Sequence, residues 1–243
     1  MGKEHPGRGS IPMNVHVICE GNSENAFVRQ VLCPYVGEMT AWSINLLPST
    51  LITSRDAKHG RVYRGGLINY RQAENNILRF AAYGEPITTM FDFYRLPVDF
   101  PGYADIDSIN EDVDKVKHME SKMAEVVYEK ASAFRRDYFI PYIQLHEFEA
   151  LFFSDLTKLK SYYLSDREQR GIDALIKETN GMMPEDIDRG EATAPARRLM
   201  DAMRYQKGST VVYPLSDIGI DHMRRKCPHF NDWISRMIGI HSA

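Results

Sequence analysis

Short apolar runs alternate with longer segments of helical periodicity along the first part of the chain. Three runs rich in β-branched or aromatic residues predict buried strands at 15–19, 87–93 and 138–145. The intervening segments repeat apolar residues at helical spacing, which predicts helices at 25–36, at 68–83 and within 105–136. Strands that alternate with helices of this length are typical of a mostly parallel sheet. The pattern therefore predicts an α/β fold.

The character of the sequence changes after Ala150, where helical periodicity dominates. Helices are predicted there at 155–164, 168–179, 195–205 and 219–238. In the first part, the pattern favours an extended segment at 43–54, a loop at 60–66, and a start of the long charged helix near Ser108 or Ile109. We expect three regions: a flexible N-terminus at 1–13, an α/β domain at 14–154, and a helical C-terminal region at 155–243 packed on it.

Composition narrows the class of protein without naming a function. The chain has 243 residues, of which 43% are hydrophobic, so it can bury a substantial core. Its net charge of −3 gives the whole molecule no strong attraction for nucleic acid, although a local basic stripe would be enough. The three cysteines form no C-x-x-C pair, and no secretory or membrane-spanning segment is evident, which favours reduced thiols in the cytoplasm.

The first apolar run leads directly into two carboxylates. Glu20 follows the predicted strand, Gly21 permits a turn, and Glu24 comes four residues after Glu20. Ser23 has the side chain of a helix N-cap, which would place Glu24 at the first helical position. Ligand sites of open α/β sheets lie outside the carboxyl ends of the strands, so this corner is a candidate site.

The other two predicted strands also end in acids. Asp92 follows the second strand, and Glu147 and Glu149 follow the third. Carboxylates gathered at one sheet edge repel each other unless a cation neutralises them, and Mg²⁺ or Mn²⁺ prefers such oxygen ligands. The alternative is that the acids pair with arginines or cap helices. His146 is a weaker candidate for a general base, since a histidine in this position more often orients a neighbour.

A basic segment lies between the first two acidic corners. Its candidate phosphate-binding residues are Arg61, Arg64, Gly65, Gly66 and Arg71. Backbone N–H groups of a Gly-Gly turn before a helix can cradle phosphate, and Tyr63 or Tyr70 could stack on a base. The alternative is a solvated loop. By contrast, residues 92–114 contain seven acids and one arginine, which is typical of a solvated face or a partner surface.

Several longer motifs resemble a known bacterial family. They are Cys-Glu-Gly-x-x-Glu at 19–24, Arg-Gly-Gly before Tyr70, Phe-Asp-Phe-Tyr-x-Leu-Pro-x-Asp-Phe-Pro-Gly at 91–102, the Tyr-Ile-Gln-Leu-His-Glu-Phe-Glu-Ala-Leu-Phe-Phe-Ser-Asp run at 142–155, and Cys-Pro-His-Phe-Asn-x-Trp at 227–233. Together they resemble the family called domain of unknown function 4276 over nearly the whole chain. That family is similar to TOPRIM proteins, which include topoisomerases, primases and the overcoming-lysogenization-defect (OLD) nucleases.

The resemblance implies a TOPRIM-like parallel sheet flanked by helices and a metal-binding site at its edge. Glu20 matches the glutamate after the first strand, Glu24 the second acid of OLD-like nucleases, and Asp92 the first acid of Asp-x-Asp. Tyr94 stands where the second aspartate is expected, and Glu147 or Glu149 is our candidate for the replacement ligand. Relatives of this type are often encoded beside ABC-type ATPases in anti-phage defence systems, which implies such an ATPase partner.

Three hypotheses follow for the function. The first is a metal-dependent nuclease effector that hydrolyses DNA or RNA, with Glu20, Glu24, Asp92 and Glu147 as catalytic residues. The second is a non-catalytic TOPRIM-like binding subunit of an ATPase complex, in which Tyr94 marks the loss of the metal site. The third is a phosphatase or nucleotide-processing enzyme that uses the same acids. A homo-oligomer is compatible with all three.

Overall fold

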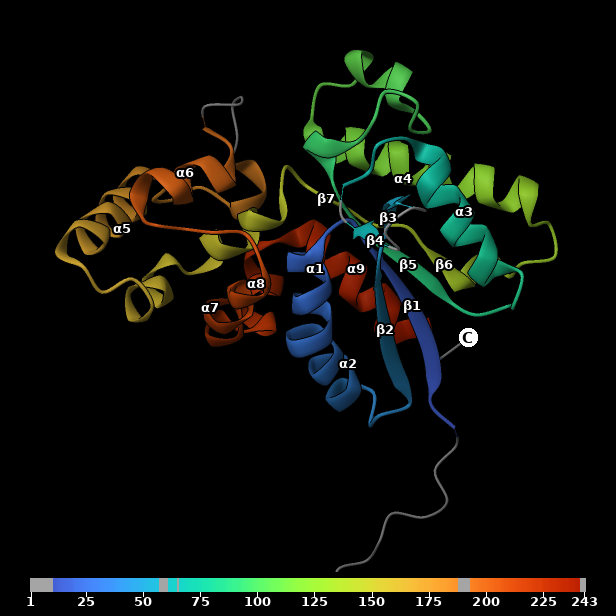
Figure 1. Ribbon diagram of the computed structural model, residues 1–243, viewed down its shortest axis with the longest axis horizontal. Coiled ribbons are helices and arrows are strands. Elements are labelled where there is room, and N and C mark those ends of the chain that lie inside the picture. Colours follow the sequence, from blue (N-terminus) through green and yellow to red (C-terminus); the bar gives the residue numbers. More distant parts are fainter. Residues whose placement is uncertain (1–10, 57–60, 65, 188–192, 241–243) are drawn as a thin grey trace, which may run out of the picture.

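The computed structural model describes residues 11–56, 61–64, 66–187 and 193–240, and it gives side-chain positions for all of these except 52–64 and 209. A parallel sheet lies between two layers of helices (Figure 1). The predicted α/β fold is therefore confirmed. Within the described ranges, no helix is both long enough and apolar enough to cross a membrane.

The sheet has the strand order β2-β1-β5-β6, and β7 pairs with β5 beyond the end of β6. All of these pairings are parallel. The strands are β1 (Met13–Cys19), β2 (Ile44–Thr50), β5 (Ile87–Asp92), β6 (Phe139–Ile140) and β7 (Ile143–Gln144). The chain passes from β1 to β2 in one direction and then returns to place β5 on the other side of β1.

The third predicted strand is interrupted, contrary to the expectation of one continuous strand at 138–145. Pro141 has no N–H for the ladder, and the next residue, Tyr142, bonds to a side chain instead. Tyr142 N donates to Thr89 Oγ1 at 2.9 Å, and the same hydroxyl donates to Tyr142 O at 2.8 Å. The break therefore still satisfies the backbone, and β7 resumes alongside the end of β5.

The basic segment is also more ordered than the loop predicted at 60–66. Strands β3 (Ile52–Asp56) and β4 (Arg61–Arg64) form a separate antiparallel pair. Val62 and Tyr63 are residue types that favour a strand, but the glycines on both sides, Gly60, Gly65 and Gly66, are typical of a loop and led to the loop prediction. This hairpin links the carboxyl end of β2 to the helix before β5.

Two groups of helices cover the sheet (Figure 1). One face carries α1 (Asn22–Phe27), its π-helical continuation (Val28–Leu32), α2 (Cys33–Met39) and α9 (Pro228–Gly239). The other face carries α3 (Tyr70–Ala81) and α4 (Asp112–Lys130). The remaining helices are α5 (Asp166–Glu178), α6 (Pro195–Ala202), α7 (Val212–Ile218) and α8 (Ile220–Lys226).

Three predicted helices differ from the observed ones. The long helix begins at Asp112, not near Ser108, because residues 103–108 form a 3₁₀ segment that turns into an extended Glu111. The segment at 155–164 is a 3₁₀ helix (Leu156–Ser161) rather than an α-helix. The helix predicted at 219–238 is broken between α8 and α9, since Pro228 cannot continue a helix but is well suited to begin one.

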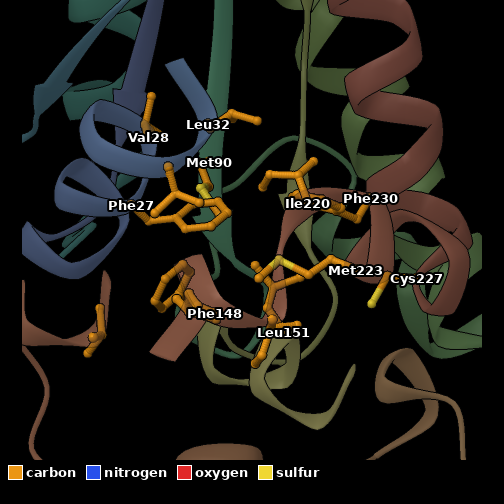
Figure 2. Packing of buried hydrophobic residues seen from close by; sticks show 14 of the residues in the cluster. Phe27, Val28, Leu32, Met90, Phe148, Leu151, Ile220, Met223, Cys227 and Phe230 are labelled. Carbon is orange, nitrogen blue, oxygen red and sulfur yellow. The ribbon is translucent and has the colours of Figure 1, made fainter. Parts of the chain in front are cut away.

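One continuous core joins the C-terminal helices to the sheet. Figure 2 shows Phe27 of α1 and Met90 of β5 packed near Phe148, Ile220 and Phe230. A buried hydrogen bond of 2.7 Å from Trp233 Nε1 to Thr88 Oγ1 also ties α9 to the sheet. A second apolar cluster fills the space under α3 and α4. The region after residue 154 is thus integrated with the α/β layer through shared apolar burial.

Candidate functional site

The chain reverses its winding direction at the boundary between β1 and β5, and the candidate site lies there. In open α/β sheets such a reversal leaves a crevice outside the carboxyl ends of the two strands. Glu20 directly follows β1, and Asp92 is the last residue of β5. Asp92 N donates to Glu20 Oε2 at 3.1 Å, so the two strand-end acids are directly linked.

Glu24 joins them from the first turn of α1. The helix N-cap is Gly21 rather than Ser23, which corrects the predicted cap and places Glu24 at the third helical position. A Cβ atom at Gly21 would lie 2.8 Å from Glu24 Oε2, so glycine allows this close approach. Ser23 serves a different purpose: its Oγ accepts a hydrogen bond from Gly208 N at 3.0 Å.

These acids line a single open cavity of about 260 Å³. The charged residues around it are Glu20, Glu24, Asp92, Arg95 and Lys207, and the glycines are Gly21, Gly66 and Gly208. The lining residues come from four widely separated places in the sequence. The cavity therefore brings together the first two predicted acidic corners and adds two basic residues.

The carboxylates of the cavity hold protons unusually tightly. Burial raises the pKa of Glu24 to about 7, and the nearby charges of Glu20 and Glu149 act in the same direction. Burial also raises the pKa of Glu20, and it raises the pKa of Asp92 well above its ordinary value, with Glu24 and Glu20 adding to the effect. The acids are thus close enough to repel one another.

Glu149 lies behind the cavity and is held by the C-terminal region. It is 1% exposed, and its carboxylate accepts hydrogen bonds from Tyr205 Oη at 2.8 Å and Lys207 Nζ at 3.0 Å. Burial lowers the pKa of Lys207, but the charges of Glu149, Glu147 and Asp92 outweigh this and raise it overall. Lys207 is therefore a permanent cation beside the acids.

Glu147 is engaged in a structural contact. Its Oε2 accepts a hydrogen bond from Ala196 N at 3.0 Å, in the first turn of α6, and Lys207 Nζ is 3.7 Å from its Oε1. It does not line the cavity that contains Glu20 and Asp92. Of the two acids after the third strand, Glu149 raises the pKa values of the cavity acids through its charge. Glu147 instead accepts a hydrogen bond from the first turn of α6.

His146 lies on the opposite side of the same corner, and its hydrogen bonds fix its tautomer. Its Nε2 is 2.8 Å from Glu185 O, which can only accept, so Nε2 carries the proton. Its Nδ1 lies 2.8 Å from Tyr94 Oη and accepts from that hydroxyl when the ring is neutral. The backbone of His146 has a φ of 62°, a strained value for a residue other than glycine. His146 orients Tyr94, and neither residue lines the acidic cavity.

The candidate phosphate-binding residues separate into three groups. Gly66 lines the cavity, and its N–H donates to Glu20 O at 3.1 Å. Arg71 is exposed at the start of α3 and has no place in the cavity lining. Gly65 and the side chains of Arg61, Arg64 and Tyr63 lie outside the described residues. Tyr70 is buried with its ring edge against Phe100, 5.1 Å between centroids, which contradicts the expected stacking on a base.

The donor set of the cavity is suited to a hard divalent cation. Carboxylate oxygens at the ends of neighbouring strands are the ligands that Mg²⁺ prefers. Burial is the main cause of the raised pKa values of Glu24 and Asp92, and the neighbouring carboxylates add to it. In the described part of the chain, no three histidine, cysteine or acidic side chains already surround a common point. Asp92 Oδ1 accepts from Phe148 N at 2.8 Å, which leaves Oδ2 available.

Four residues of the site were not foreseen from the sequence. Arg95 and Lys207 supply its positive charge, Tyr205 holds Glu149, and Ser23 fixes the segment that carries Lys207. The only available signal for Arg95 was its position three residues after Asp92. Tyr205 and Lys207 lie in an irregular segment between α6 and α7, where neither periodicity nor spacing indicated a functional residue.

Comparisons with known proteins agree with the motif resemblance. The family model described as Domain of unknown function (DUF4276) matches residues 19–238, which is nearly the whole chain. Neither the curated proteins nor the solved structures gave a significant match. The matched region includes all four acids of the site, Glu20, Glu24, Asp92 and Glu149. The chain is therefore a member of the DUF4276 family.

Proposed function

We propose that the protein is a Mg²⁺- or Mn²⁺-dependent nuclease that hydrolyses a phosphodiester bond at the β1–β5 edge. The observation that carries this proposal is the shared cavity of Glu20, Glu24 and Asp92, with Lys207 beside it. The acids would hold the cation. An adjacent lysine adds a place for the negative charge of a phosphate oxygen, as phosphoryl transfer requires.

Glu20, Glu24 and Asp92 would hold the metal, and Glu149 would support Lys207 from behind. When bound, the metal activates a water molecule and stabilises the negative charge that develops on the phosphorus centre. Lys207 and Arg95 then orient the phosphate by contacting its non-bridging oxygens. Glu149 and Tyr205 restrict the lysine side chain, so that its charge is already in position before substrate arrives.

The biological setting rests on the resemblance to TOPRIM-type nucleases. We infer a cytoplasmic effector of a bacterial anti-phage defence system that works with an ABC-type ATPase. Residues 99–114 contribute six acids and no lysine or arginine, which is a charge distribution suited to a basic partner surface. The substrate would then be DNA or RNA delivered by, or made accessible through, that partner.

One observation favours a second candidate, a non-catalytic TOPRIM-like subunit of the same ATPase complex. Tyr94 occupies the position of the second acid of Asp-x-Asp, and its hydroxyl bonds to His146 rather than lining the acidic cavity. A site with one acid fewer binds metal more weakly. This candidate predicts stable association with the ATPase and no cleavage under any metal condition.

The first test is cleavage of labelled tRNA, plasmid and single-stranded DNA by the purified protein with Mg²⁺, Mn²⁺ or EDTA. Glu20→Gln is the informative variant, because a glutamine oxygen can still accept the hydrogen bond from Asp92 N while the charge is lost. Glu125→Gln is the matched control, since Glu125 is exposed and pairs with Lys122 on α4. Metal-dependent cleavage that Glu20→Gln abolishes and Glu125→Gln retains supports the nuclease.

Equal cleavage by wild type and Glu20→Gln would sink the proposal, since a contaminating nuclease would then account for the activity. The same assay in the presence of the ATPase partner separates the two candidates. Cleavage that appears only with the partner, and only with Glu20 intact, supports a partner-activated nuclease. Association without cleavage supports the non-catalytic subunit.

A further inference from the structure

A second cavity, of about 210 Å³, lies next to the acidic one and has a different character. Its walls are mainly aromatic, from Phe152, Tyr162, Tyr163, Tyr205 and Tyr213, and Val211 and Pro214 add apolar surface. Two polar side chains, Gln206 and Thr210, also line it. It contains no charged residue, in contrast to the cavity of Glu20 and Asp92. The proposed chemistry does not use it.

The two cavities share one wall. The segment that follows α6 contributes Tyr205 and Gln206 to the aromatic cavity, and Lys207 and Gly208 to the acidic cavity. The same short segment of chain therefore borders both cavities. Tyr205 connects them directly, because its ring lines one cavity and its hydroxyl donates to Glu149 beside the other.

The aromatic cavity is held in shape before any ligand arrives. Tyr162 Oη donates to Asp217 Oδ2 at 2.6 Å, which fixes one ring at the surface. The rings of Phe152 and Tyr205 meet edge to face, with 5.7 Å between their centroids. The side of the cavity that faces solvent is nevertheless apolar, since Tyr162 is 40% exposed and Tyr213 59% exposed. Exposed aromatic rings beside two amide or hydroxyl groups are suited to a flat, heteroaromatic ligand.

We propose that this cavity binds a nucleobase of the substrate strand, adjacent to the phosphate that the acidic site attacks. In a nucleotide, one sugar separates the base from its phosphate. The two cavities are neighbours along residues 205–208, so one could hold the base and the other the phosphate. Tyrosine rings provide stacking that tolerates any base, and Gln206 and Thr210 can hydrogen-bond to base edges. A duplex keeps its bases inside the stack, so the substrate class is single-stranded or unstacked nucleic acid. This inference rests on the proposed nuclease function.

The test measures binding in EDTA, without reference to cleavage. Two labelled single-stranded probes of equal length, an oligothymidylate and its abasic counterpart, are compared by fluorescence anisotropy. Wild type is expected to prefer the thymidine probe, and Tyr213→Ala is expected to reduce that preference about fivefold or more, the loss typical of one stacked base. Tyr83→Ala is the control, since Tyr83 is 75% exposed and does not line the cavity.

Tyr162 provides a second, graded pair of variants. Tyr162→Phe keeps the ring and loses only the hydrogen bond to Asp217, so it should retain most of the preference that Tyr162→Ala loses. Circular dichroism of each variant establishes that it is folded. Equal affinity of wild type for both probes, or equal effects of Tyr213→Ala and Tyr83→Ala, overturns the inference.

Cleavage distinguishes this failure from failure of the proposed function. Metal-dependent cutting of the abasic and thymidine probes at equal rates would overturn the base cavity and leave the nuclease intact. A base preference that depends on Tyr213, without cleavage under any metal condition or with the ATPase, would support the cavity and contradict the nuclease. Faster cleavage of single strands than of duplex, lost in Tyr213→Ala, supports both.

Discussion

Lys207 Nζ lies 3.0 Å from Glu149 Oε2, although 58 residues separate the two in the sequence. The lysine reaches the acids from an irregular segment whose position is fixed by the hydrogen bond from Gly208 N to Ser23 Oγ. Burial is the largest cause of the raised pKa values of Glu20 and Asp92. The charge of Lys207 lowers both pKa values and so opposes burial. Together with Arg95, its ammonium group thus supplies the internal counter-charge of the site.

Lys207→Met should therefore affect both stability and activity. Without its counter-charge, the metal-free protein should unfold at a lower temperature, and the deficit should be larger at pH 8 than at pH 5, where more of the acids are protonated. Cleavage should fall roughly 100-fold, as for loss of one group that stabilises developing charge. Lys122→Met, which removes an exposed lysine from α4, should leave both quantities nearly unchanged. A similar deficit at both pH values would show that lost packing, not lost charge, is responsible.

Glu24→Gln should stabilise the metal-free protein above neutral pH. Since the pKa of Glu24 is raised to about 7 in the folded state, its ionisation opposes folding. The contribution of Glu24 to stability is therefore fully present below the ordinary carboxyl pKa of 4.5 and is lost as the pH rises from there through about 7. At pH 8 the variant should gain roughly 1 to 3 kcal/mol in free energy of unfolding. Urea unfolding at pH 5 and pH 8 measures this, and the gain should shrink at the lower pH.

A gain of equal size at both pH values would contradict this account, since the raised pKa of Glu24 acts only where the carboxyl group is ionised. Glu111→Gln is the control, because Glu111 lies at the start of α4 and does not line the acidic cavity.

Mg²⁺ should stabilise the wild type and fail to stabilise Asp92→Asn. At about 100 times its Kd, a ligand that binds only the folded state adds about 2.7 kcal/mol. Asparagine keeps an oxygen that can accept the hydrogen bond from Phe148 N, so the fold should be retained while the charge is lost. Thermal unfolding with increasing Mg²⁺ measures the effect. Asp105→Asn, at an exposed carboxylate near His118, should respond to Mg²⁺ as the wild type does; loss of the response there too would point to nonspecific binding.

The packing of α5 against α6 depends on Gly171. A Cβ atom there would lie 2.0 Å from Ala202 O, a distance that requires the two helices to separate. Gly171→Ala should therefore lower the free energy of unfolding by about 1 to 3 kcal/mol, as overpacking typically does. Gly239→Ala is a matched control, because no atom within 4 Å would contact the new methyl group. Chemical denaturation that ranks the two variants in the opposite order would contradict the packing described here.

The sequence predicted the parts of the site that depend on strand ends. Glu20 and Asp92 could be located because apolar runs marked β1 and β5, and parallel strands bring their carboxyl ends to one edge. The same periodicity predicted α3 and α5 to within a few residues. Local pattern was sufficient in these cases because burial on a sheet or helix face imposes a fixed period.

The remaining features depend on contacts between distant parts of the chain. The contacts of Lys207 and Tyr205 with Glu149 join segments more than 50 residues apart. Hydrophobic periodicity describes only neighbouring residues, so it cannot predict such contacts. Glu147 and Glu149 are equivalent in sequence, two residues apart after the same strand. Their different roles are set by Ala196 N and by the residues that follow α6. The break at Pro141 depends similarly on the hydroxyl of Thr89, in a neighbouring strand.

The bond from Gly208 to Ser23 spans 185 residues, and this separation has a consequence during synthesis. A ribosome translates every candidate carboxylate well before it reaches Lys207, and α9, which pins the last helices to Thr88, comes later still. A nascent or truncated chain that stops before residue 205 is therefore expected to carry the acids without Lys207 and without Tyr205 and Tyr213 of the aromatic cavity. The order of synthesis therefore completes the site only when the chain itself is nearly complete, because Lys207 and Gly208 are among its last lining residues.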